Sequence, residues 1–75
     1  MSETCSTLID RIIELRKESG MTQKELAEAA NLAQPAIARM ESKTATPQLD
    51  TLLKILAPMG KTLAVVPLKT NKYRN

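Results

Sequence analysis

Apolar residues recur along most of this chain at the spacings of three and four that are typical of amphipathic helices. The first such stretch covers residues 7–19, with charged side chains on the opposite face. Its apolar positions are Leu8, Ile9, Ile12, Ile13 and Leu15. Gly20 follows directly, and a glycine just beyond a helix favours the left-handed conformation that ends it. The pattern predicts a helix over residues 7–19, preceded by a flexible N-terminus at residues 1–6.

Two shorter helices are predicted next, at residues 23–30 and 34–41. Residues 22–25 read Thr-Gln-Lys-Glu, a capping box in which the side chains of Thr22 and Glu25 each bond the other's backbone amide. Asn31 can adopt the left-handed conformation that ends the first of these helices. Pro35 lies in the first turn of the second, where its missing N–H does no harm. Both helices are separated by a tight turn in which Leu32 anchors the chain to the core.

The C-terminal third of the chain predicts one more helix and then a strand. Pro47 begins a helix that runs to about residue 59, where Pro58 and Gly60 break it. Its expected buried positions, with Ile55 at their edge, are Leu49, Leu52, Leu53 and Leu56. Residues 61–68 are apolar and β-branched, which favours a strand. The helical bundle is thus expected over residues 7–59, and residues 69–75 are expected to form a flexible tail.

A single strand needs hydrogen-bonding partners, and the sequence predicts no second strand. The simplest solution is antiparallel pairing with the same strand of a second copy about a two-fold axis. The dimer interface expected on this basis comprises Met59, Thr62, Leu63, Ala64, Val65, Val66 and Leu68. Two alternatives stay open: residues 61–68 pack as an extended tail on the helices, or they pair with the sheet edge of another protein.

Composition narrows the functional classes. The chain has 75 residues and 43% hydrophobic residues, which predicts a single folded domain over residues 1–75. There is no histidine and only one cysteine, Cys5, so neither a disulfide within one chain nor a cysteine zinc cluster is expected. Asp10 and Glu14 lie one helical turn apart, but without a histidine or third ligand they are best interpreted as a solvated charged face. We therefore expect a cytoplasmic binding module, not an enzyme, with no cofactor, metal site or membrane segment.

Charge is distributed unevenly along the chain. Residues 1–41 carry five cationic and seven anionic side chains, whereas residues 42–75 carry six cationic and one anionic. One explanation is chance, because a small protein can carry an uneven charge distribution without functional meaning. The alternative is a basic face that meets an anion, most commonly nucleic-acid phosphate.

The two short helices have the proportions of a helix-turn-helix, in which the second helix enters the DNA major groove. On the expected outer face of that helix, Gln34 can bond adenine bidentately and Arg39 can bond guanine or a phosphate. Gln23, at the start of the preceding helix, and Lys43 and Thr44, after the second, are placed for backbone phosphates. Considered alone, these polar residues could equally be a solvated helix face.

Residues 21–41 (MTQKELAEAANLAQPAIARME) resemble the Cro/C1-type (XRE) helix-turn-helix domain, with the Thr-Gln-x-Glu-Leu-Ala motif, Ile37 and Glu41 in register. The resemblance covers roughly residues 8–57. It implies a mostly α, lambda-repressor-like bundle of four to five helices with a C-terminal β-strand pairing across a dimer. It assigns base contacts to Gln34, Pro35, Ala36 and Arg39, and phosphate contacts to Gln23 and the loop near Lys43. The full set of expected phosphate contacts is Thr22, Gln23, Lys43 and Thr44. The chain departs from the family at Ala33, where Ser or Thr usually caps the helix, and at Lys43, where glycine is common.

Residues 47–68 are similar to the corresponding part of HigA-type antitoxins of type II toxin–antitoxin systems. That similarity implies a homodimer that binds a palindromic operator in double-stranded DNA, represses its own operon and neutralises an mRNA-cleaving toxin of the RelE/HigB-like kind. Two alternatives remain open. One is a plain XRE-type transcriptional repressor with no toxin partner, and the other is a helical interaction module that has lost DNA binding.

Overall fold

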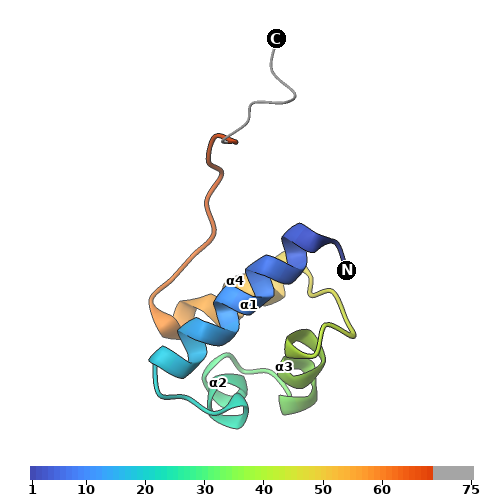
Figure 1. Cartoon of the computed structure of the whole chain (residues 1–75). Helices are drawn as coiled ribbons and strands as arrows, with labels where there is room; N and C mark the ends of the chain where they lie inside the picture. The colour runs from blue at the N-terminus through green and yellow to red at the C-terminus, as the bar shows by residue number, and fades with distance from the viewer. Residues whose placement is uncertain (69–75) are drawn as a thin grey trace.

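The computed structural model describes residues 1–68, which form four α-helices and one short 3₁₀ turn. The helices are α1 (Glu3–Glu18), α2 (Gln23–Ala29), α3 (Gln34–Glu41) and α4 (Leu49–Leu56), and the 3₁₀ turn η1 covers Ala57–Met59. In Figure 1, α2 and α3 lie on one side of α1, and residues 61–68 leave the helices on the other side. The predicted tail at residues 69–75 lies outside the described residues. No helix among residues 1–68 has the length and apolar character needed to cross a membrane.

The core is aliphatic and draws on all four helices. Its buried side chains are Ile9, Ile12, Leu26, Ala27, Ala30, Ile37, Met40, Ile55 and Leu56. Because α2 and α3 are only two turns long, they gain little stability from their own hydrogen bonds and depend on this shared burial. The core therefore fixes the position of α3 relative to α1 and α4.

The helix α1 begins earlier than its apolar pattern predicts. Ser2 caps it, with its hydroxyl accepting a hydrogen bond from the Cys5 amide at 3.2 Å, and Glu3 lies in the first turn. Residues 3–6, expected to be flexible, are therefore helical. A serine cap and an acidic first turn stabilise a helix end without any apolar residue, so periodicity alone misses this turn.

The buried face of α4 also differs from the expectation. Ile55 and Leu56 are buried, whereas Leu49 is 66% exposed and Leu53 is 40% exposed. Leu49 and Leu56 are seven residues apart and lie on the same face of this helix, so the pattern predicts the face but not that its N-terminal end extends beyond the core. The helix is also shorter than predicted, because residues 57–59 tighten into η1 before Gly60 adopts a left-handed conformation with φ of 69°.

The β-strand predicted for residues 61–68 is not formed. A strand requires a neighbouring segment for its ladder, and residues 1–60 consist of helices, turns and loops. Residues 64–68 are all exposed, so the alternative of a tail packed on the helices also fails beyond the partly buried Leu63. Pairing with a second copy stays a prediction.

Candidate nucleic-acid interface

The α2–α3 unit forms as the local sequence predicts. The Thr22 hydroxyl accepts from the Glu25 amide at 3.0 Å, and the Glu25 carboxylate accepts from the Thr22 amide at 2.9 Å. The backbone hydrogen bond from the Thr22 amide and the side-chain bond to Thr22 both lower the pKa of Glu25. Asn31 takes a φ of 57°, and the Leu32 amide donates to the Ala27 carbonyl at 2.8 Å. These contacts set the tight turn that leads into α3.

The outer face of α3 collects the side chains predicted to contact bases. Gln34, Pro35 and Arg39 are exposed and Ala36 is partly buried, whereas Ile37 and Met40 on the opposite face are buried in the core. Within residues 1–68, the Arg39 guanidinium forms no ion pair. This face of α3 is therefore accessible, and within residues 1–68 it carries one amide, one cation without an ion-pair partner, and the small side chains of Pro35 and Ala36.

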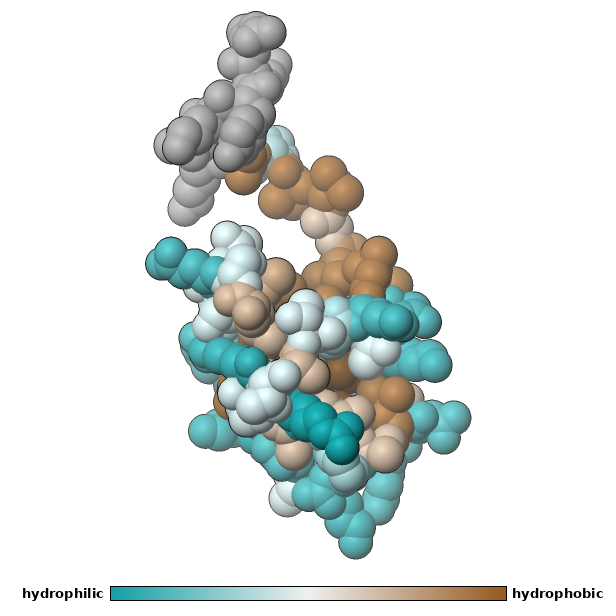
Figure 2. Space-filling model, turned by 90° about the vertical axis from the view of Figure 1, so that its right-hand side faces the viewer, coloured by the Kyte–Doolittle hydropathy of each residue, from teal (hydrophilic) through white to brown (hydrophobic). Residues whose placement is uncertain are grey.

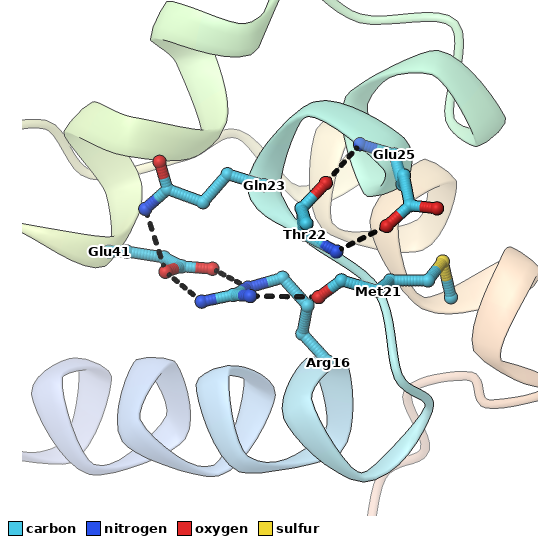
Figure 3. Close-up of polar contacts among 6 residues, drawn as sticks. All are labelled: Arg16, Met21, Thr22, Gln23, Glu25 and Glu41. Atoms are coloured by element: carbon cyan, nitrogen blue, oxygen red, sulfur yellow. Dashed lines mark hydrogen bonds and ion pairs between the residues drawn. The ribbon is translucent and has the colours of Figure 1, made fainter.

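A polar network behind α3 joins three segments that lie far apart in the sequence (Figure 3). Arg16 Nε donates to Glu41 Oε2 at 2.6 Å and Arg16 Nη2 donates to Glu41 Oε1 at 2.9 Å. Arg16 Nη1 also donates to the Met21 carbonyl at 2.9 Å, and Gln23 Nε2 donates to Glu41 Oε1 at 3.0 Å. The side chains of Arg16 and Glu41 are only 11% and 7% exposed. The network therefore ties the end of α3 to α1 and to the start of α2.

Electrostatics at Glu41 favour the charged carboxylate. Burial raises the pKa of Glu41. The opposing effect is larger: the pKa is lowered by hydrogen bonds from Arg16 and Gln23 and by the positive charges of Arg16 and Lys17. The net result is a pKa for Glu41 below its ordinary value of 4.5. At neutral pH the network therefore holds a carboxylate and a guanidinium, the strongest type of hydrogen-bonded pair.

The two residues predicted to contact phosphate at the start of α2 each form hydrogen bonds within residues 1–68. Gln23 gives one of its two amide N–H groups to Glu41, which leaves the second for a ligand. The Thr22 hydroxyl accepts from the Glu25 amide and is exposed at the N-cap of α2. Both side chains lie in the first turn of α2 or at its cap, where the helix dipole favours an anion.

The two predicted phosphate contacts after α3 each have a partner inside the protein. Lys43 Nζ lies 2.7 Å from Asp10 Oδ1 in α1, and the Lys43 backbone has a φ of 64°. The Thr44 hydroxyl donates to the Arg39 carbonyl at 3.2 Å, as does the Ser42 hydroxyl. Lys43 thus occupies the left-handed position where the resemblance expects glycine, and hydroxyls close the end of α3.

Sequence reasoning missed three participants in this site. Arg16 was predicted only as part of a helix, Glu41 only as a motif residue, and Asp10 only as a member of a solvated face. Asp10 and Glu14 do not act together, because Asp10 pairs with Lys43 and Glu14 pairs with Arg11 at 3.3 Å. The partners of Arg16 and Asp10 lie more than twenty residues away, and no local pattern marks such a pairing.

The predicted dimer residues lie around an apolar groove on the other side of the molecule. Leu49 and Leu53 of α4 line it together with Leu63, Ala64 and Val65 of the segment that follows Gly60, and its volume is about 450 Å³. Figure 2 shows apolar surface that follows this segment and continues onto the adjoining helices. The remaining predicted members, Thr62, Val66 and Leu68, are exposed, and Met59 is partly buried. Residues 61–68 and α4 thus form one continuous apolar surface.

Comparisons with known proteins agree with this architecture. The profile of a helix-turn-helix family matches residues 12–66. An uncharacterized HTH-type transcriptional regulator of Haemophilus influenzae is 50% identical over 62 residues, which are 83% of this chain and 63% of that protein. A solved toxin–antitoxin module from Streptococcus pneumoniae aligns with a TM-score of 0.72 and 51% identity, over 89% of this chain and 74% of the matched one. The chain therefore spans just under two thirds of its curated relative.

Proposed function

The chain belongs to the XRE-type helix-turn-helix family of DNA-binding regulators, which are not enzymes, and on that premise we propose that it is a cytoplasmic antitoxin. As a homodimer it binds a palindromic operator and represses its own operon. It also binds and neutralises a toxin of the RelE/HigB-like, mRNA-cleaving kind. The first part rests on the geometry of α3, and the toxin partner rests on the likeness to the pneumococcal toxin–antitoxin module.

The open face of α3 is the observation that carries the DNA-binding proposal. Gln34 bonds adenine N6 and N7, Arg39 bonds guanine O6 and N7, and the small side chains of Pro35 and Ala36 let the helix enter the groove closely. Around this helix, phosphates are bound by Thr22, Gln23, Lys43 and Thr44. Arg39 suits a base contact because no carboxylate within residues 1–68 neutralises it.

The apolar groove supports the homodimer. Leu49, Leu53 and Val65 are exposed in one chain at 66%, 40% and 103%, and none of the groove residues is charged. A contiguous exposed apolar surface of this kind marks an interface. A second copy covers it with an identical surface about a two-fold axis, and residues 61–68 of the two copies pair as antiparallel strands. Two α3 helices held about 34 Å apart then read half-sites about 10 bp apart.

Titration of a labelled duplex tests DNA binding. The probe is the DNA directly upstream of the chain's own gene, and a scrambled duplex of equal length is the reference. We expect tighter binding to the upstream duplex and a steep loss of affinity with salt. Equal binding to both duplexes contradicts operator recognition, and no binding to either favours the interaction-module alternative.

Substitution of Arg39 tests its assignment to a base. Arg39→Ala should cost about 1–3 kcal/mol on the upstream duplex and relax the preference at one base position. Lys54→Ala is the matched control, because it removes an exposed cation from α4 and leaves α3 untouched. An equal loss on upstream and scrambled duplexes would instead assign Arg39 to a phosphate.

Co-expression tests the toxin. We expect the chain to co-purify with a small RelE/HigB-like protein encoded beside it, and to restore growth that this protein arrests. An operator-binding chain that neither captures nor neutralises such a neighbour is a plain XRE-type repressor.

A further inference from the structure

The ammonium of Lys43 has an internal partner that its proposed DNA contact must replace. Lys43 Nζ lies 2.7 Å from Asp10 Oδ1, which joins the turn after α3 to the middle of α1. The two side chains are 33% and 57% exposed, so solvent and solutes reach the pair. A phosphate oxygen can therefore compete with the Asp10 carboxylate for the same ammonium.

The backbone at Lys43 is fixed, so only the side chain can respond. The Lys43 amide donates to the Met40 carbonyl and the Thr44 amide donates to the Arg39 carbonyl, each at 3.0 Å. Two hydroxyls also donate to the Arg39 carbonyl and close the turn. Lys43 Nζ must therefore leave Asp10 by side-chain rotation when it binds a phosphate.

The two cations proposed to contact DNA differ in this respect. Arg39 forms no ion pair within residues 1–68, whereas Lys43 is neutralised by Asp10. A contact from Arg39 breaks no ion pair of the described residues, whereas a contact from Lys43 requires the loss of its pair with Asp10. We propose that Asp10 limits DNA affinity by competing with phosphate for Lys43. This inference rests on the proposed DNA-binding function.

The effect has a defined signature. Phosphate contacts carry no base information, so Asp10 lowers affinity for operator and non-operator DNA by the same factor. Removal of its charge should tighten binding even though the free protein loses an ion pair. A purely structural role for Asp10 predicts weaker binding, because a less stable α1–α3 contact would not improve recognition.

The experiment is a double-mutant cycle of Asp10→Asn and Lys43→Ala, with affinity measured on the upstream and scrambled duplexes. Asp10→Asn should bind both duplexes about two- to five-fold more tightly than wild type, the range expected for loss of an exposed ion pair. In the Lys43→Ala background, Asp10→Asn should change affinity by less than about 1.5-fold. Thermal unfolding of all four proteins checks that each remains folded.

Glu14→Gln is the matched control, because it makes the same charge change one turn later on α1, at a carboxylate paired with Arg11. An equal gain for Glu14→Gln, or a gain for Asp10→Asn that persists without Lys43, means general repulsion of DNA and overturns the inference. Unchanged or weaker binding of Asp10→Asn overturns it too, while the proposed function stands. Absence of DNA binding by the wild-type chain overturns both.

Discussion

Arg16 and Glu41 form a two-pronged ion pair across 25 residues of sequence, with N–O distances of 2.6 and 2.9 Å. Their side chains are almost fully buried, so this pair differs from the solvent-exposed ion pairs of the helices. It joins α1 to the last residue of α3, and Gln23 extends it to α2. The pair therefore adds a polar contact at the end of α3 to the packing of Ile37 and Met40 in the core.

Removal of the Glu41 carboxylate should destabilise the fold strongly. Glu41→Gln leaves the buried Arg16 guanidinium without a counter-charge, and we expect a loss of about 3 kcal/mol in the free energy of unfolding. Urea titration followed by circular dichroism measures it. Glu14→Gln, which breaks an exposed ion pair with Arg11, should cost less than about 1 kcal/mol. Similar losses for both variants would contradict a special role of burial at Glu41.

Stability should fall in acid partly through the same residue. Because the folded-state pKa of Glu41 lies below its ordinary value of 4.5, its contribution is present above pH 4.5 and is lost as the pH falls through the folded-state pKa. Wild type should therefore lose more stability than Glu41→Gln between pH 5 and pH 2. Urea midpoints measured across that range test this, and parallel curves would contradict it.

The N-terminus of α3 can be improved. Ala33 already has the extended backbone of a cap, with φ of −76° and ψ of 141°, but no side-chain hydrogen bond. Ala33→Ser supplies the missing acceptor and should stabilise the fold by about 1 kcal/mol. Ala29→Ser, at the last residue of α2, is the control and should give no gain. The thermal midpoints of both variants provide the comparison.

Lys43 should carry backbone strain that glycine relieves. Its φ of 64° is left-handed, and the cost to a residue with a Cβ is about 1 kcal/mol. Lys43→Gly and Lys43→Ala both lose the pair with Asp10, so their difference isolates the backbone. We expect the glycine variant to unfold at higher urea concentration than the alanine variant. The reverse order would mean that flexibility in the unfolded chain outweighs the strain.

The apolar face of α4 should determine the oligomeric state. Leu53→Glu introduces a charge into the groove beside Leu63, and we expect it to dissociate the dimer while the 40% exposed side chain leaves the core intact. Sedimentation velocity measures the mass, and circular dichroism checks helicity. Lys54→Glu, at the adjacent exposed position, should remain dimeric. A dimer that survives Leu53→Glu would exclude this face from the interface.

Local sequence rules predicted the α2–α3 unit well. The capping box at Thr22 and Glu25, the left-handed Asn31 and the bounds of α3 are all confirmed, because each depends on residues within a few positions. The XRE-type family is confirmed as well. The exposed placement of Gln34 and Arg39 follows from helical periodicity, but their contacts with DNA stay predictions.

What the sequence did not predict depends on contacts between distant segments or on packing choices. The pairs of Arg16 with Glu41 and of Asp10 with Lys43 arise only when α1 meets the end of α3. The exposure of Leu49 reflects its place in the first turn of α4, beyond the core that buries Leu56 on the same face. The strand at residues 61–68 requires a ladder partner that residues 1–60 do not supply, so single-chain folding leaves it unformed.

The three hydrogen bonds that converge on the Glu41 carboxylate have a consequence for the thermodynamics of binding. They hold α3 in one orientation before any ligand arrives, so association with a rigid duplex need not freeze a moving helix. The conformational entropy that the protein loses at this interface then comes mainly from exposed side chains such as Gln34 and Arg39.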